Sequence, residues 1–191
     1  CRQFTNAIIV FCSSVSVYKD STEIITETSE LNPVTPYAIS KLIGEEIVKK
    51  HSKYRIVRIA SMYGEAMKLN TFLPLIIQGA QINDKITLFG NGDRLQNYIH
   101  VSDVAAYLFA SGKTLKNDVF LATAKASVTN KEVAQYVKDV LPQIEVVFNG
   151  NDDSKSYIYN NLFTNMQLQV EANKTLKKEI EHLIIWMKNE S

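Results

Sequence analysis

TPYAISKLIGEEIVKKHSKYRIVRIA, residues 35–60, contains the two neighbouring elements that decide the fold of this chain. Thr35 is a typical N-cap and the proline after it suits the first helical position, so the stretch predicts a helix over 36–50. The β-branched residues of 55–60 predict a short buried strand. An apolar run at 7–12, AIIVFC, predicts another such strand ahead of the helix. The order strand, helix, strand indicates a right-handed crossover between parallel strands, and therefore an α/β architecture.

The rest of the chain predicts shorter alternating elements. Helices are expected at 72–81, from Ser102 to 113, from the capping box Thr129-Asn130-Lys131-Glu132 to 141, and along a C-terminal apolar stripe that begins at Leu176. Strands are expected at 86–89, 97–101, 119–122 and 144–148, with a turn at Gly90-Asn91-Gly92. Helices and strands thus alternate to the end of the chain.

Composition excludes two classes of partner. Lys and Arg number 21 and Asp and Glu number 20, so no net field would attract nucleic acid or an anionic membrane. We find no signal peptide and no apolar stretch of bilayer length, and predict no membrane partner. Two cysteines are too few for a disulfide framework; Cys12 is expected to be a buried thiol and the location a reducing cytoplasm. The chain does not begin with Met, so we expect a fragment of a longer protein.

Tyr37 and Lys41 lie four residues apart in the expected helix, so their side chains share one face about a turn apart. A free tyrosine has a pKa near ~10, and a cation within reach can lower it by roughly one to three units. A phenolate stabilised in this way can take a proton from a hydroxyl and return it to a carbonyl. Ser14 follows the preceding strand at its carboxyl end, where it can hydrogen-bond the reacting oxygen.

No metal is predicted, because no cluster of Cys, His and carboxylate residues has the spacing of a zinc site. His100 could serve as a general base. In its place between a strand and a helix, however, we expect it to order the neighbouring turn by hydrogen bonding.

Four motifs in order resemble the extended short-chain dehydrogenase/reductase family, which includes nucleotide-sugar epimerases and dehydratases. The family shows a strand ending in Ser-Ser, then Val-Tyr, then Pro-Tyr-x-x-Ser-Lys, an Arg-x-x-Asn-x-Tyr-Gly segment, and Gly-x-Gly followed by Tyr-Ile-His-Val-x-Asp. The corresponding stretches here are SSVSVY at 13–18, PYAISK at 36–41, RIASMYG at 58–64, and LFGNG at 88–92 followed by YIHVSDVA at 98–105. The resemblance covers nearly the whole chain, and the order of the motifs makes it far more specific than any one of them.

The resemblance implies a fold and a division of the chain. It implies an α/β chain made of the C-terminal part of a Rossmann-like parallel sheet and a small α/β substrate-binding domain. Residues 1–62 with 101–124 would form the remainder of the dinucleotide-binding domain. Residues 63–100 with 125–191 would form the substrate-binding domain.

The resemblance also implies roles for individual residues. Ser14, Tyr37 and Lys41 would be the catalytic residues, with Tyr37 and Lys41 also at the cofactor and Lys41 on the nicotinamide ribose. The backbone around Ile59 and Ala60 would flank the nicotinamide of NAD. Contacts to a nucleotide-sugar substrate would come from a larger set: Ser14, Ser61, Thr71, Phe72, Leu88, Phe89, Arg94 and Gln96.

Three departures from the family pattern limit these implications. No G-x-x-G-x-x-G loop for the cofactor pyrophosphate occurs, so we expect that an upstream part carries it. Gln96 and Gly150 stand where two arginines commonly grip the substrate diphosphate, and Arg94 is close enough to compensate. Val15-Ser16 replaces the Asp-Glu pair of dehydratases and the Cys of certain reductases, which disfavours both reactions.

The leading hypothesis is therefore an NAD-dependent epimerase of nucleotide sugars that resembles UDP-glucose 4-epimerase. An NADP-linked sugar or carbonyl reductase is a rival, because the residues that choose the cofactor are absent. A non-catalytic sensor or scaffold is a second rival. A homodimer is expected, as is usual for this family; Ile39, Ile43 and Ile47 could form the contact between helices, although packing on the sheet explains the stripe equally well.

Overall fold

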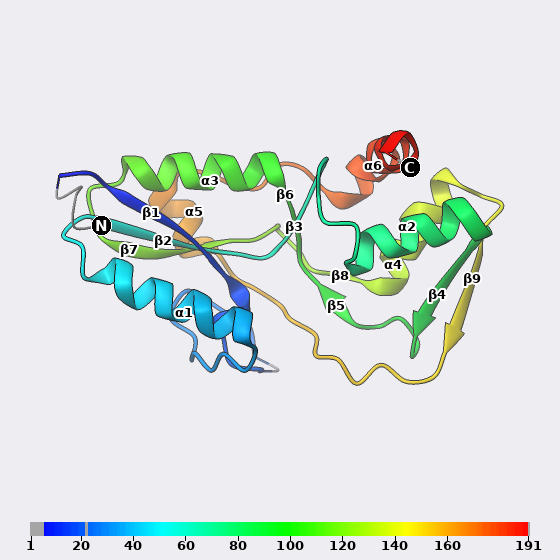
Figure 1. The fold of residues 1–191 in the computed structure, drawn as a ribbon, viewed down its shortest axis with the longest axis horizontal. Helices are drawn as coiled ribbons and strands as arrows, with labels where there is room; N and C mark the ends of the chain where they lie inside the picture. Colours follow the sequence, from blue (N-terminus) through cyan, green and yellow to red (C-terminus); the bar gives the residue numbers. More distant parts are fainter. Residues whose placement is uncertain (1–5, 22, 191) are drawn as a thin grey trace.

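A three-stranded parallel sheet lies at the centre of the first half of the molecule, in a computed structural model that describes residues 6–21 and 23–190. The strands β1 (Ile9–Ser14), β2 (Tyr54–Ile59) and β7 (Asp118–Ala122) follow the order β1-β2-β7. Helices α1 (Pro36–Lys49) and α3 (Val101–Lys113) cover its two opposite faces (Figure 1). The predicted strand, helix, strand order and the α/β class are confirmed.

Helix α1 begins at the residues that the sequence predicts. The hydroxyl of Thr35 accepts a 3.1 Å hydrogen bond from the amide of Ala38, and the proline occupies the first turn. The helix packs on the sheet through Ala38, Glu45 and Val48, which are buried. Gly44 allows the close approach, because a Cβ there would lie 2.3 Å from the Phe11 ring.

A second group of elements surrounds a separate apolar core. The strands β4 (Lys85–Phe89) and β9 (Glu145–Asn149) pair in parallel, beside the helices α2 (Phe72–Asn83), α4 (Asn130–Val140) and α6 (Leu176–Glu190). Ile77, Val137 and Leu183 are among the buried residues of this core. The predicted capping box opens α4, since Thr129 and Glu132 exchange their side-chain and backbone hydrogen bonds.

Short pieces connect the two groups. The strands β3 (Ser61–Tyr63) and β6 (Tyr98–His100) pair in parallel, and β5 (Leu95–Gln96) and β8 (Val128–Thr129) pair antiparallel. A 3₁₀ turn, η1 (Val15–Val17), follows β1, and α5 (Leu162–Leu168) packs near β7. The chain between β9 and α5 runs back along the molecule as an extended segment, called the strap here, residues 150–160 (Figure 1).

One expectation about side-chain burial is wrong, and one of the two alternatives for the isoleucine stripe is excluded. Cys12 is exposed rather than buried. Ile39, Ile43 and Ile47 are 43%, 55% and 54% exposed, so packing on the sheet does not explain the stripe. The reason is that α1 uses its Ala38 and Val48 side against β1 and β2, and the isoleucines lie on another side of the helix.

Among the described residues, no helix combines the length and the apolar character needed to cross a membrane.

Candidate active site

A cavity of about 700 Å³ opens at the carboxyl ends of β1 and β2. Its lining includes every residue predicted for catalysis or cofactor binding: Ser14, Tyr37, Lys41, Ile59 and Ala60. They come from the end of one strand, the first turns of α1 and the end of the next strand. Ligand sites of open parallel sheets lie at this edge, because the loops that leave the strands meet there.

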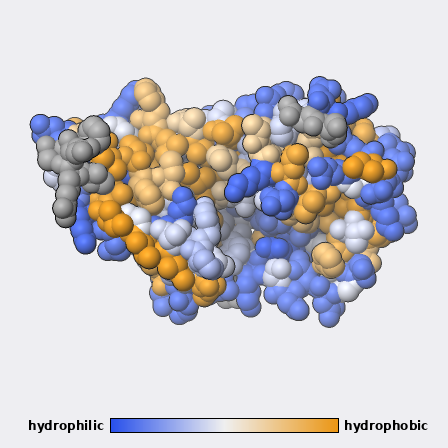
Figure 2. Space-filling model, in the orientation of Figure 1, coloured by the Kyte–Doolittle hydropathy of each residue, from blue (hydrophilic) through white to orange (hydrophobic). Residues whose placement is uncertain are grey.

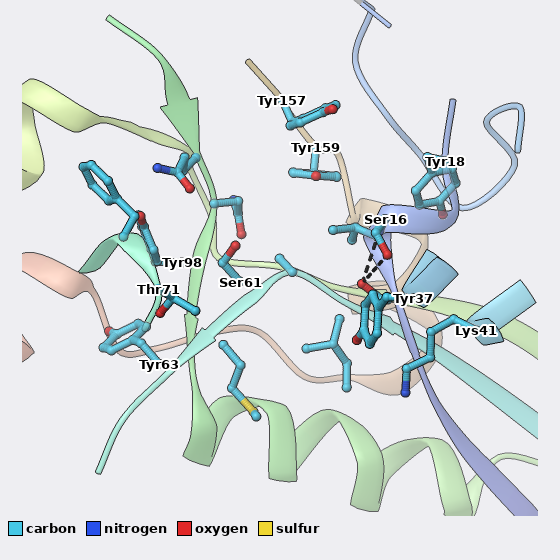
Figure 3. A pocket seen from close by; sticks show the side chains of 18 of the residues that line it. Ser16, Tyr18, Tyr37, Lys41, Ser61, Tyr63, Thr71, Tyr98, Tyr157 and Tyr159 are labelled. Atoms are coloured by element: carbon cyan, nitrogen blue, oxygen red, sulfur yellow. Dashed lines mark hydrogen bonds between the residues drawn. The ribbon is translucent and has the colours of Figure 1, made fainter. Parts of the chain in front are cut away.

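Ser14 is oriented by the turn that follows it. Its Oγ accepts a 3.0 Å hydrogen bond from the hydroxyl of Ser16 and a 3.2 Å hydrogen bond from the Ser16 amide. Figure 3 marks both contacts of Ser16 by dashed lines. A serine hydroxyl has one hydrogen to donate and two lone pairs. With both lone pairs engaged, Ser14 is left to act as a donor to an oxygen in the cavity.

Lys41 places a positive charge beside Tyr37. Its Nζ donates a 2.9 Å hydrogen bond to the carbonyl oxygen of Cys12 and lies 5.5 Å from the centre of the Tyr37 ring. The Tyr37 side chain points into the open cavity and is 56% exposed (Figure 3). No described residue forms a hydrogen bond with the Tyr37 hydroxyl, which leaves it available to a ligand.

All but one of the residues predicted for substrate binding line two adjoining cavities. Ser61, Thr71 and Gln96 line the first cavity. Phe72 and Arg94 line both the first and a second cavity of about 510 Å³, which also includes Phe89. The two cavities together thus form an elongated site that starts at Ser14 and reaches Phe89.

Leu88 does not join this site. Its side chain is fully buried in the core around α2 and α4, because side chains alternate along β4 and Leu88 points to the opposite side from Phe89. Its side chain therefore has no surface to offer a ligand in this structure.

Arg94 and Gln96 differ in their freedom to bind an anion. Gln96 donates a 2.7 Å hydrogen bond from Nε2 to the side-chain oxygen of Asn130, so its amide is engaged within the protein. Arg94 uses only Nε, in a 3.3 Å hydrogen bond to the carbonyl of Lys155. Lys41 and Arg94 are the cations among the described residues that line the first cavity.

Sequence reasoning did not assign Asp20 and Tyr159, which also line the cavity. Tyr157, on the strap, donates a 2.6 Å hydrogen bond from its hydroxyl to Oδ1 of Asp20. Burial and this hydrogen bond raise the pKa of Tyr157 to about 12. Asp20 is the only carboxylic acid among the described lining residues. Asp20 lies beside the strap only because of the tertiary structure, which the sequence does not show. The one local signal that could have assigned Asp20 to the site is its position two residues after the Val-Tyr pair.

His100 has the structural role predicted from the sequence. Its Nδ1 accepts a 3.1 Å hydrogen bond from the amide of Ser102 and thereby caps α3. The helix begins at Val101 with His100 as its N-cap, so the predicted cap at Ser102 is wrong. Burial and the charge of Lys174 lower the pKa of His100. It lines a separate small cavity of about 210 Å³ and does not reach the site of Tyr37.

Comparison with known proteins agrees with this geometry. Residues 1–121 match the family model described as the NAD dependent epimerase/dehydratase family. A putative UDP-glucose 4-epimerase of Methanocaldococcus jannaschii is 27% identical, over 98% of this chain and 65% of its own length. A UDP-glucose 4-epimerase of Lactobacillus helveticus is 30% identical, over 69% of this chain and 48% of its own length. The chain thus spans less than two thirds of either relative.

Among solved structures, MoeE5 in complex with UDP-glucose and NAD superposes with a TM-score of 0.86 at 20% identity. The match covers 100% of this chain and 68% of that one. A likeness of this extent confirms the predicted fold.

Proposed function

The chain belongs to the NAD dependent epimerase/dehydratase family, and on that basis we propose that its complete gene product is an NAD-dependent epimerase of a nucleotide sugar. The observation that carries the proposal is the convergence of Ser14, Tyr37 and Lys41 on one cavity in which Asp20 is the only acid among the described lining residues. The motif resemblance to the family is confirmed by the family match; the roles of these residues are part of the proposal.

The residues at the end of β1 and β2 fit the nicotinamide end of NAD. Lys41 Nζ has three N–H bonds and spends one on the carbonyl of Cys12, which leaves two for a pair of ribose hydroxyls. Ile59 and Ala60 give the cavity a small apolar wall against which a flat ring can lie. NAD, when bound, supplies the acceptor and the donor of hydride. We assign no described residue to its pyrophosphate.

Tyr37 is the proposed proton carrier. Lys41 carries its positive charge 5.5 Å from the centre of the Tyr37 ring, and the Tyr37 oxygen takes the proton of a sugar hydroxyl. Ser14 donates a hydrogen bond to the same sugar oxygen and stabilises it as it becomes a carbonyl. When the hydroxyl is restored on the other face of the sugar, Tyr37 returns the proton.

The lack of a free acidic side chain beside Ser14 and Tyr37 favours epimerisation over elimination of water. Elimination needs a second acid and base beside the reacting carbons. Val15 and Ser16 have no carboxyl group, and the hydroxyl of Ser16 is spent on Ser14. Asp20 accepts the hydrogen bond of Tyr157 and is thereby engaged at the strap. The residues present therefore support proton transfer at a single sugar carbon.

The two adjoining cavities support a substrate with a long, anionic part. The sugar would lie beside Ser14 and Tyr37, and the nucleotide would extend past Arg94 toward Phe89. The Arg94 side chain donates one hydrogen bond, from Nε, and so keeps both Nη groups for a phosphate, beside the carboxylate of Asp152 in the second cavity. An aromatic ring at Phe89, 61% exposed, offers a surface for a base.

We also propose a homodimer formed through α1. The exposed isoleucines 39, 43 and 47 form an apolar band on the surface of this helix, visible in Figure 2 over the position that α1 has in Figure 1. A second copy of the same helix would cover this band, since a two-fold contact pairs one surface patch with itself.

The test is to incubate the complete gene product with NAD and UDP-glucose and to follow the sugar by proton NMR. We expect UDP-galactose to accumulate to equilibrium with no net change in NAD. A 4-keto-6-deoxy sugar would instead identify a dehydratase, and stoichiometric conversion of NAD to reduced cofactor with oxidation of the sugar would identify a sugar oxidoreductase. Absence of NAD binding in a fluorescence titration would identify a scaffold. Each of these three results overturns the proposal.

A further inference from the structure

A fully buried carboxylate joins α1 to the strands beneath the candidate site. The carboxylate of Glu45, 0% exposed, accepts hydrogen bonds from three donors. Ser13 Oγ donates to Oε1 at 2.5 Å, and Arg58 donates from Nε to Oε1 at 3.0 Å and from Nη2 to Oε2 at 2.7 Å. Ser13 and Arg58 are direct neighbours across β1 and β2, so the three side chains form one compact cluster.

Arg58 is held on its other sides as well. Its Nη1 donates a 3.1 Å hydrogen bond to the carbonyl of Glu27, and its guanidinium lies 4.8 Å from the centre of the Tyr18 ring. Burial alone would lower the pKa of Arg58, but its hydrogen bonds and charge interactions with Glu45 and Tyr18 together outweigh burial, and the pKa is raised. A buried ion pair is weak evidence for stability, because desolvation offsets much of the attraction. Its geometric effect on the neighbouring residues is therefore the more informative property.

The cluster lies directly beside the candidate catalytic residues. Lys41 and Glu45 are one helical turn apart on α1, and they bind consecutive residues of β1: Lys41 the carbonyl of Cys12, and Glu45 the hydroxyl of Ser13. The next residue is Ser14, at which the pairing of β1 with β2 ends. Because Ser14 is the last residue of this ladder and lines the cavity, the hydrogen bond of Ser13 is the side-chain anchor that immediately precedes it.

We propose that Ser13 and Glu45 are positioning residues, which fix the end of β1 against α1 and so hold the hydroxyl of Ser14 at a constant distance from Tyr37. Arg58 keeps the Glu45 carboxylate in place from β2. The proposal rests on the proposed function in one respect only, that Ser14 and Tyr37 act on the same substrate oxygen. The fixed geometry itself can be measured without substrate.

The experiment compares Ser13→Ala with Ser111→Ala in the complete gene product. Ser111 is a matched control: it is also fully buried, and its hydroxyl donates to the carbonyl of Leu108 on α3, away from the cavity. Ser13→Ala leaves both contacts between Arg58 and Glu45 intact, so no unpaired charge is created. For each variant we would measure kcat, KM, affinity for NAD, thermal unfolding and hydrogen–deuterium exchange of residues 14–17.

We expect Ser13→Ala to lower kcat about tenfold, since small misplacements of reacting groups have effects of this size or larger. KM and NAD affinity should stay within about twofold of the native values, because the Ser13 hydroxyl donates its hydrogen bond to Glu45 and not to a ligand. Exchange at residues 14–17 should become about tenfold faster in Ser13→Ala, whereas Ser111→Ala should change neither kcat nor this exchange.

Two results would overturn the proposal: unchanged exchange at residues 14–17 in Ser13→Ala, or a loss of kcat equal in the two serine variants. Faster exchange in Ser13→Ala, together with a native protein that does not epimerise any nucleotide sugar, would uphold the positioning and refute the proposed function instead. The two ideas can thus fail separately.

Discussion

The hydroxyl of Tyr157 donates a 2.6 Å hydrogen bond to Oδ1 of Asp20, and this contact ties the strap to the loop that follows η1. The strap is also bound by its backbone, since Ile25 donates to the carbonyl of Ile158 and Tyr157 donates to the carbonyl of Leu95. The side chains of Tyr157 and Asp20 both line the candidate cavity. The contact therefore encloses the site with residues that lie far apart in the sequence.

This relationship predicts how stability depends on alkaline pH. The pKa of Tyr157 is raised from 10.0 to about 12, so the folded protein holds the phenol neutral over a range in which the unfolded chain ionises it. Its contribution to stability is complete below pH ~10 and is lost as the pH rises through about 12. In urea titrations, Tyr157→Phe should show a smaller loss of unfolding free energy between these two pH values. An identical loss in the native protein and the variant would contradict the assigned contact.

Removing the cation beside Tyr37 should slow catalysis. Lys41→Gln takes away the positive charge 5.5 Å from the centre of the Tyr37 ring and should lower kcat/KM by roughly 100-fold, the contribution of a positioned acid–base group. Lys113→Gln is the control, because Lys113 lies 4.0 Å from the centre of the Phe109 ring on α3, outside the candidate cavity. A native value of kcat/KM in Lys41→Gln would argue against the role of Lys41.

Ser16 should act on catalysis only through Ser14. Loss of its 3.0 Å hydrogen bond to Ser14 leaves that hydroxyl less firmly directed, and Ser16→Ala should lower kcat about fivefold, the value of one hydrogen bond of about 1 kcal/mol. In a double-mutant cycle, Ser16→Ala should have no further effect once Ser14 is alanine. Effects that multiply in the double variant would mean that Ser16 contacts the substrate independently.

The apolar band on α1 should control the oligomeric state. Ile43→Glu places a charge in the middle of the band and should convert a dimer into a monomer in sedimentation velocity experiments. Ile82→Glu is a suitable control, because Ile82 is 76% exposed on α2 and lies outside the band. A dimer that persists in Ile43→Glu would place the contact elsewhere.

The sequence predicted the parts of the fold that depend on local signals. The caps Thr35 and Thr129 and the apolar runs of β1 and β2 are properties of a few consecutive residues. The strands β3 and β5 escaped prediction, because two or three residues adopt this conformation only when a distant partner pairs with them.

In the candidate site, too, residues in local motifs could be predicted from the sequence, and features that depend on tertiary structure could not. Ser14, Tyr37 and Lys41 could be found because they sit in ordered motifs. Leu88 was assigned to the substrate although its side chain is buried, because a motif does not tell which of two alternating residues points outward. Glu45 and Arg58 were not assigned to a buried cluster, since charged residues on helices and strands are usually exposed.

The most direct test of the central claim is turnover by Tyr37→Phe in the complete gene product, measured by proton NMR with UDP-glucose, alongside NAD affinity from a fluorescence titration. The phenylalanine keeps the ring that lies 5.5 Å from Lys41 and removes only the hydroxyl. We expect native NAD affinity and a loss of kcat of about 100-fold or more, the contribution of a positioned acid–base group. Retained turnover in Tyr37→Phe would contradict the role of Tyr37 as the proton carrier.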